Sequence, residues 1–307
     1  MLTPRKAFSA MVLWCLLVAA ASPLPAQQSP ATRKPKVYIS VDMEGIAALA
    51  IPRSQMAPAG LDYDYGRRLM TAEANAAIAG AFDGGASAVT VSDSHGSEIN
   101  LLADQLDGRA ELITGKPRPY VMMEGIDSTF DAVVFVGYHP RASSLGHNDH
   151  TFSLQIKRIS LNGTEVGEDG LSAALAAHFG VPVVFLSGDA AVAAQATAAY
   201  PGIVSVAVKE AIGRFAVKTI NPAEAVARIR AGVKEAVSRA KSIRPVRREE
   251  PIAIEFEVSH TGQSEAALLI PGMIRVAPRV VRFVATDMPT AYRLAALVSM
   301  LVDPIQP

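Results

Sequence analysis

Apolar, strand-like runs alternate with amphipathic helical patterns through most of the chain, and this order strongly limits the possible folds. The helical patterns cover about 67–82, 168–179, 190–199 and 222–241. The strand-like runs lie at 37–41, 88–91, 132–136, 183–186 and 203–206. Such an alternation predicts an α/β fold with a mostly parallel central sheet and helices on both faces.

The C-terminal part of the chain predicts a smaller α/β unit. The segment 243–251 is charged and contains two prolines, which is typical of a linker. We therefore expect a domain at 27–242 and a unit at 252–307 packed on it. Strands are expected there at 253–258 and 280–285, and helices at 264–269 and 289–302. Earlier in the chain, residues 151–161 alternate polar and apolar side chains and end at Asn162-Gly163, which predicts a hairpin.

The first 26 residues have the pattern of a secretory signal peptide. Arg5 and Lys6 precede an apolar run at about 7–21, which is short for a membrane span of about 20 residues. We expect cleavage after Ala26 and a periplasmic or secreted mature protein without membrane contact. The alternatives are an uncleaved anchor and a lipoprotein attached through Cys15, against which Trp14 argues because a small residue is expected there.

The cysteine count and the charge balance exclude several classes of function. Cys15 is the only cysteine, so the mature chain would have no disulfide, no thiolate metal site and no cysteine nucleophile. Lys and Arg number 29 and Asp and Glu number 29, whereas a nucleic-acid surface should be basic. We expect a soluble globular protein without a nucleic-acid partner.

Two carboxylates follow the first strand-like run, in the stretch SVDMEGI at 40–46. Side chains two residues apart on a strand project from the same face, so Asp42 and Glu44 repel each other unless a cation lies between them. Two further runs end close to His95 and His139. In a parallel sheet, ligands bind at the carboxyl ends of the strands. Taken singly, each of these residues is more often structural than functional, but together they predict a site.

Imidazole and carboxylate are the ligands that zinc binds when no thiolate is available. With one zinc ion, two carboxylates and two histidines would fill a tetrahedral shell. Two ions that share a carboxylate need about five protein ligands and leave room for a water. Glu168, at the start of a predicted helix, is the candidate fifth ligand, although a helix dipole also favours an acid there.

Nine short segments occur in an order that resembles one enzyme family. They are SVDMEGI, GRRLMTAEAN (66–75), SDSH (92–95), MMEG (122–125), GYH (137–139), VGE (166–168), SGD (187–189), AVK (207–209) and IPG (270–272). Together they resemble the D-aminopeptidase family of binuclear zinc metallopeptidases, of the dipeptide-operon type, over about residues 36–302. SVDMEG with SDSH and GYH is the specific part of the match, and the C-terminal segments are weaker.

The resemblance implies a set of site residues. Asp42, Glu44, His95, His139 and Glu168 would bind two zinc ions per chain, with Asp42 as the bridge. His150 falls at the position of the catalytic histidine of the family, eleven residues after His139.

Two alternatives to this set stay open. Asp169 competes with Glu168 as a ligand, and His147 lies in the same loop as His150. We expect His147 to be solvated, as loop histidines without a defined partner usually are.

The resemblance implies the removal of an N-terminal residue, a D-amino acid, from short peptides, and it implies a homo-oligomer. A water bound to zinc has its pKa lowered towards about 7, which predicts attack by a metal-bound hydroxide. His150 would act as acid and base, or as the nucleophile. HExxH, G-x-S-x-G and glycine-rich phosphate motifs do not occur. The alternatives are a non-catalytic periplasmic protein that binds metal or peptide, and a binuclear hydrolase of other amides or esters.

Overall fold

The computed structural model describes Met1 and residues 33–305. The described residues from Lys34 onward make up one compact unit, and the account below concerns this unit. The predicted signal peptide, apart from Met1, lies outside the described residues. Among the helices that the structure describes, none has the length and apolar character needed to cross a membrane.

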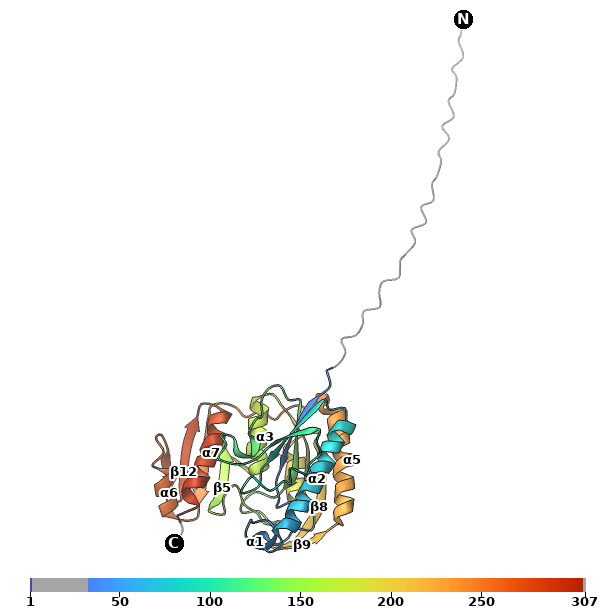
Figure 1. The fold of residues 1–307 in the computed structure, drawn as a ribbon. Helices are drawn as coiled ribbons and strands as arrows, with labels where there is room; N and C mark the ends of the chain where they lie inside the picture. The colour runs from blue at the N-terminus through green and yellow to red at the C-terminus, as the bar shows by residue number, and fades with distance from the viewer. Residues whose placement is uncertain (2–32, 306–307) are drawn as a thin grey trace. The chain divides into compact units, whose positions relative to one another are not determined.

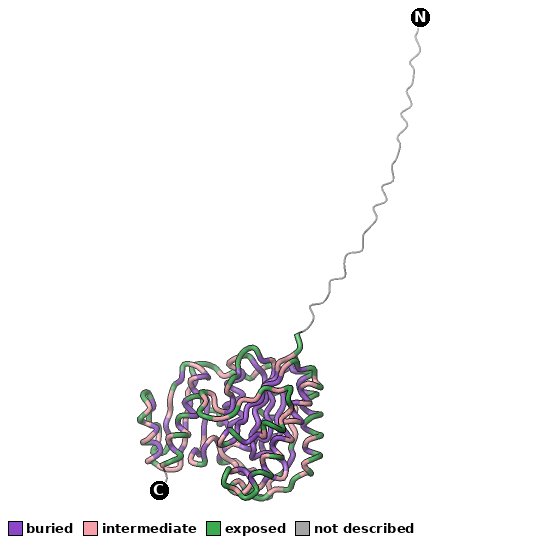
Figure 2. Tube along the Cα trace, viewed as in Figure 1, coloured by how far each residue is buried: buried purple, intermediate pink, exposed green. Residues whose placement is uncertain are grey.

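A seven-stranded sheet forms the centre of the fold (Figure 1). Its strands follow the order β3-β2-β1-β4-β7-β8-β9, and all neighbours pair in parallel except β8 and β9. The strand bounds are β1 (Lys36–Val41), β2 (Ala88–Asp93), β3 (Ala110–Ile113), β4 (Ala132–Tyr138), β7 (Val183–Asp189), β8 (Val204–Gly213) and β9 (Ala216–Thr219). Because β1 and β4 are apolar on both faces, they lie in the middle of the sheet and are almost fully buried (Figure 2).

Helices cover both faces of this sheet and enclose two hydrophobic cores. Helices α2 (Tyr63–Asp83) and α5 (Pro222–Ser238) pack on the face that carries Ile39 and Val134. Helices α3 (Glu168–His178) and α4 (Ala190–Ala199) contribute to the core on the opposite face, with Tyr38 and Phe135. The remaining short helices of this part are α1 (Pro52–Gln55), η1 (Val121–Met123) and η2 (Ala240–Ser242).

A second, antiparallel sheet of five strands has the order β11-β12-β10-β5-β6. Its strands are β5 (Ile156–Leu161), β6 (Thr164–Val166), β10 (Ile252–Val258), β11 (Ile274–Ala277) and β12 (Val280–Ala285), and α6 (Thr261–Ala267) and α7 (Met288–Val302) accompany them. The hairpin at Asn162-Gly163 forms as predicted, and both residues have positive φ, as a two-residue type I′ turn requires. The second sheet therefore joins a hairpin from the middle of the chain to the C-terminal strands.

The predicted fold class is confirmed, and the differences concern short elements. The edge strands β3, β9 and β11 were not predicted, because their half-exposed sequences of four residues carry no clear alternation. The strand predicted from residue 151 begins at Ile156, and the helix predicted at 264–269 lies at Thr261–Ala267. The domain boundary predicted at 243–251 stays a prediction.

Candidate metal centre

The carboxyl ends of β2, β1 and β4 lie next to one another and bring four predicted site residues together. Asp42 and Glu44 follow β1, His95 follows β2, and His139 follows β4. All four side chains are buried. The chain after β1 passes very close to β4, because Gly45 N–H donates to the carbonyl of Gly137 at 2.7 Å. A Cβ on Gly45 would lie 2.0 Å from the carbonyl oxygen of Tyr138, so only glycine fits there.

Asp42, Glu44 and His95 form the first of two groups whose ligand atoms lie within 4.8 Å of one another. His95 Nδ1 lies 2.8 Å from Glu44 Oε2 and 3.3 Å from Asp42 Oδ1. Its Nε2 lies 2.7 Å from the carbonyl oxygen of Met56, to which it must donate. In a neutral ring the lone pair is then on Nδ1, which faces the carboxylates and is available to a metal.

His139, His150 and Glu168 form the second group. His139 Nδ1 donates to the carbonyl of Pro140, and its Nε2 lies 3.2 Å from Glu168 Oε2. His150 Nδ1 donates to the carbonyl of Asn148, and its Nε2 lies 3.8 Å from Glu168 Oε1. The two rings stack, with centroids 4.0 Å apart. Each ring thus uses one nitrogen for the backbone and presents the other to the centre.

Asp42 lies between the two groups. Its Oδ1 faces His95, and its Oδ2 lies 3.4 Å from His139 Nε2. Oδ2 is buried and has no hydrogen-bond partner within the described part of the chain. A buried carboxylate oxygen without a partner is costly, which indicates that a bound cation belongs at this position. The donor set, carboxylate and imidazole without thiolate, fits zinc.

The electrostatics of the metal-free centre show how closely these groups are coupled. Burial, followed by the Glu44 carboxylate, raises the pKa of Asp42 well above its usual 3.8. Burial lowers the pKa of His139, but Glu168 and Asp42 outweigh it and raise that pKa to about 10. The pKa of His95 also lies well above 6.5, because Glu44 and Asp42 outweigh its burial. The buried carboxylates therefore favour positive charge at this centre.

Three comparisons with known proteins agree with this geometry. The sequence model of the family described as D-aminopeptidase matches residues 36–297. The chain is 37% identical over 268 residues to the D-aminopeptidase of Bacillus subtilis (strain 168), covering 87% of this chain and 97% of that protein. This chain belongs to the D-aminopeptidase family.

A solved structure from the family has the same fold. The Zn-dependent D-aminopeptidase DppA from Bacillus subtilis, described as a self-compartmentalizing protease, matches with a TM-score of 0.84 and 35% identity. The match covers 89% of this chain and 99% of that one. The family resemblance inferred from SVDMEG, SDSH and GYH is therefore confirmed.

In this site of a D-aminopeptidase-family protein, the structure places Glu168 and Asp169, the two alternative ligands, in different surroundings. Glu168 belongs to the second group, and its Oε1 accepts a hydrogen bond from Phe152 N–H at 2.6 Å. Asp169 belongs to neither group and accepts from the Tyr200 hydroxyl at 3.0 Å.

His147 was expected to be solvated, and this is wrong. The ring is fully buried beside the loop after β1, where its Nε2 donates to the carbonyl of Ala50.

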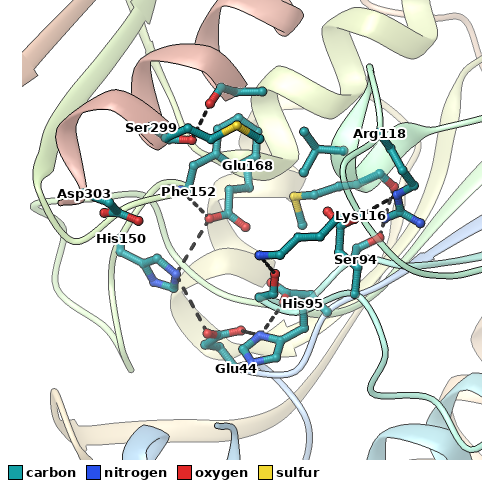
Figure 3. Close-up of a pocket in the computed structure, with 17 residues that line it drawn as sticks. Glu44, Ser94, His95, Lys116, Arg118, His150, Phe152, Glu168, Ser299 and Asp303 are labelled. Carbon is teal, nitrogen blue, oxygen red and sulfur yellow. Dashed lines mark hydrogen bonds and ion pairs between the residues drawn. The ribbon is translucent and has the colours of Figure 1, made fainter. Parts of the chain in front are cut away.

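A pocket of about 190 Å³ opens over both groups (Figure 3). Its walls come from loops, from η1 and from α7, none of which lies at the end of a predicted strand. Arg118 and Lys116 lie at one end and Asp303 at the other, with Val121, Met122, Phe152, Ala296 and Met300 among the apolar residues of the lining. Met122 belongs to the segment MMEG, but no pattern placed the other lining residues at the site, because loops carry no periodicity and α7 lies far along the chain from Glu168.

Proposed function

We propose that this protein is a zinc-dependent aminopeptidase that removes an N-terminal D-amino acid from short peptides, with two zinc ions per chain. The observation that carries the proposal is the position of Asp42, which turns one oxygen towards each of the two ligand groups. A shared carboxylate between two such groups is how a pair of metal ions is held. The zinc dependence described for the Bacillus subtilis structure supports the choice of metal.

Five residues would hold the two ions: Asp42, Glu44, His95, His139 and Glu168. Zinc bound there would polarise the scissile carbonyl and lower the pKa of a water. The rings of His95 and His139 donate to backbone carbonyls, and Glu168 accepts from Phe152 N–H, so these donor atoms are held in place before any metal binds. Such anchoring by outer partners is typical of metal sites in proteins.

His150 would carry out the chemistry that the metal ligands do not. Burial and the neighbouring His139 lower the pKa of His150, so its ring is neutral near pH 7. Its Nδ1 is occupied by the carbonyl of Asn148, which leaves Nε2 as the nitrogen that meets substrate. Proton transfer and attack on the carbonyl both use this atom.

The pocket suits a short peptide with a free carboxyl end. Lys116 lines it and donates from Nζ to the carbonyl of Gly96 at 2.8 Å, so an ammonium group stands beside the ligand groups. The terminal carboxylate of a dipeptide such as D-Ala-D-Ala is the partner that this charge favours. If residues 1–26 direct export, the enzyme would encounter such peptides from cell-wall turnover outside the cytoplasm. N-terminal sequencing of the exported protein tests the expected cleavage after Ala26.

Metal analysis combined with a substrate panel tests the function. The expected result is about two zinc ions per chain, with turnover of D-aminoacyl amides and dipeptides in preference to the L-forms. A preference for L-substrates would remove the stereochemical part of the proposal. A zinc-loaded protein without turnover of any peptide would instead favour a binding protein, and turnover of other amides or esters alone would favour the more general hydrolase.

Zinc affinity is expected to rise steeply with pH around neutrality. Without zinc the pKa of His139 is about 10, so this ring holds a proton at pH 7, and the Glu44 and Asp42 carboxylates also raise the pKa of His95 well above its usual 6.5. Zinc binds the neutral rings, and each displaced proton raises the association constant about tenfold per pH unit. The His139 proton alone predicts about tenfold per unit. Calorimetry in buffers of different ionisation enthalpy counts the protons released, and a count of zero would contradict these charge states.

A further inference from the structure

Besides SDSH with Asp93, three of the sequence segments of the family contain buried charged residues that are not part of the metal centre. These are Glu73 on α2, Asp189 at the end of β7 and Lys209 on β8. Their exposed fractions are 2%, 0% and 3%, and charged residues are rarely buried so completely unless they are paired. All three contact the segment 44–50 or the residues that hold it, so they converge behind the loop that carries Glu44.

Lys209 lies at the centre of this cluster. Its Nζ donates to the carbonyl oxygens of Glu44 at 2.5 Å, Ile46 at 2.9 Å and Leu49 at 2.7 Å. An ammonium group has three N–H donors, and these three carbonyls use all of them. Burial lowers the pKa of Lys209 to about 7, while Glu73 and Asp189 act in the opposite direction. The three acceptors favour the ammonium form, because only that form has three N–H groups.

Other side chains also form hydrogen bonds that fix the backbone of the same loop. Glu73 Oε1 accepts from Ala47 N–H at 2.8 Å, and Thr219 Oγ1 accepts from Ala48 N–H at 3.0 Å. Asp189 Oδ2 accepts from the N–H of His147, whose ring donates to the carbonyl of Ala50 at the end of the loop. The segment 44–50 belongs to no helix or strand, so these side chains take the place of a regular hydrogen-bond pattern.

The two sides of Glu44 face different partners. Its carboxylate points towards His95 and His150 at the floor of the pocket (Figure 3), whereas its carbonyl is bound to Lys209 on the other side. We propose that Lys209 is a positioning residue for the metal centre. Its ammonium group holds the loop after β1 in the conformation that places the Glu44 carboxylate where it can bind the metal. The inference rests on the proposed zinc site, but the hold on the loop exists without metal.

Two variants of Lys209 test this role. Lys209→Met combined with Glu73→Gln removes two of the three buried charges. Asp189, the third, still accepts from the N–H groups of His147 and Val192, and the oxygen of the new amide can still accept from Ala47 N–H. Lys209→Arg keeps the charge, but a planar guanidinium cannot place three donors on the same three carbonyls. Lys218→Met is the control, because Lys218 is an exposed lysine on the adjacent strand β9.

Zinc affinity by chelator competition is expected to fall about 10–100-fold in both Lys209 variants, as it does when outer partners of metal ligands are removed. The visible spectrum of the Co²⁺-substituted protein should change, and the amides of residues 45–50 should exchange hydrogen faster in the metal-free protein. The control should match the wild type in all three. A folded Lys209 variant with unchanged affinity, spectrum and exchange would overturn the inference. A wild type that binds no zinc would refute the proposed function instead, and the exchange measurement would still decide the role of Lys209.

Discussion

Replacement of His150 by alanine is expected to lower kcat/KM about 10²–10⁴-fold, which is the usual contribution of a positioned acid–base group. The zinc content and the melting temperature should stay close to those of the wild type. The ring is part of the pocket lining, and its Nε2 lies 3.8 Å from both Glu44 Oε1 and Glu168 Oε1. It is thus farther from the carboxylates than His95, whose Nδ1 lies 2.8 Å from Glu44 Oε2.

The control for this variant is His178→Ala. His178 lies at the other end of α3 from Glu168 and pairs with Glu250 at the surface, and exposed pairs of this kind contribute only about 0–1 kcal/mol. His147 would be a poor control, because it is buried and holds the loop after β1. Loss of a zinc ion from His150→Ala would show that His150 is a ligand, since it shares a group with His139 and Glu168. Full activity in that variant would remove His150 from the mechanism.

Glu168→Gln is expected to remove a zinc ion and to lower activity about 10³-fold or more, because a bound metal supplies several kcal/mol of transition-state stabilisation. The amide keeps the size of the side chain and can still accept from Phe152 N–H through its oxygen. It cannot supply a negative charge to the metal. Zinc content and kcat measured on the same sample should therefore fall together.

The matched control is Asp169→Asn, the same kind of change in the next residue of the same helix. Its side-chain oxygen can still accept from the Tyr200 hydroxyl, so both zinc ions and most of the activity should remain. Loss of zinc from Asp169→Asn, with zinc retained in Glu168→Gln, would reverse the assignment of the ligand. Restoration of Glu168→Gln by added zinc would indicate weakened binding and not a lost step in the reaction.

Much of the fold and of the metal centre could be predicted from local patterns. The strand–helix alternation predicted the central sheet, and Asn162-Gly163 predicted the hairpin. Asp42, Glu44, His95 and His139 were found because polar residues that directly follow apolar strands must meet at one edge of a parallel sheet. That argument needs only the position of each residue relative to the end of its own strand.

Only the tertiary structure decided the partners that come from distant segments. The sequence did not show that Lys209, on the far side of β7 from β4, reaches three carbonyls of the loop after β1, or that α7 forms a wall of the pocket. It also did not show that His147 is buried and that Asp169 points away from the ligand groups. Such contacts depend on how loops cross the sheet and how side chains pack between layers. A residue can be placed on its own strand or helix by periodicity, but its neighbours across the core are set by the packing of the whole chain.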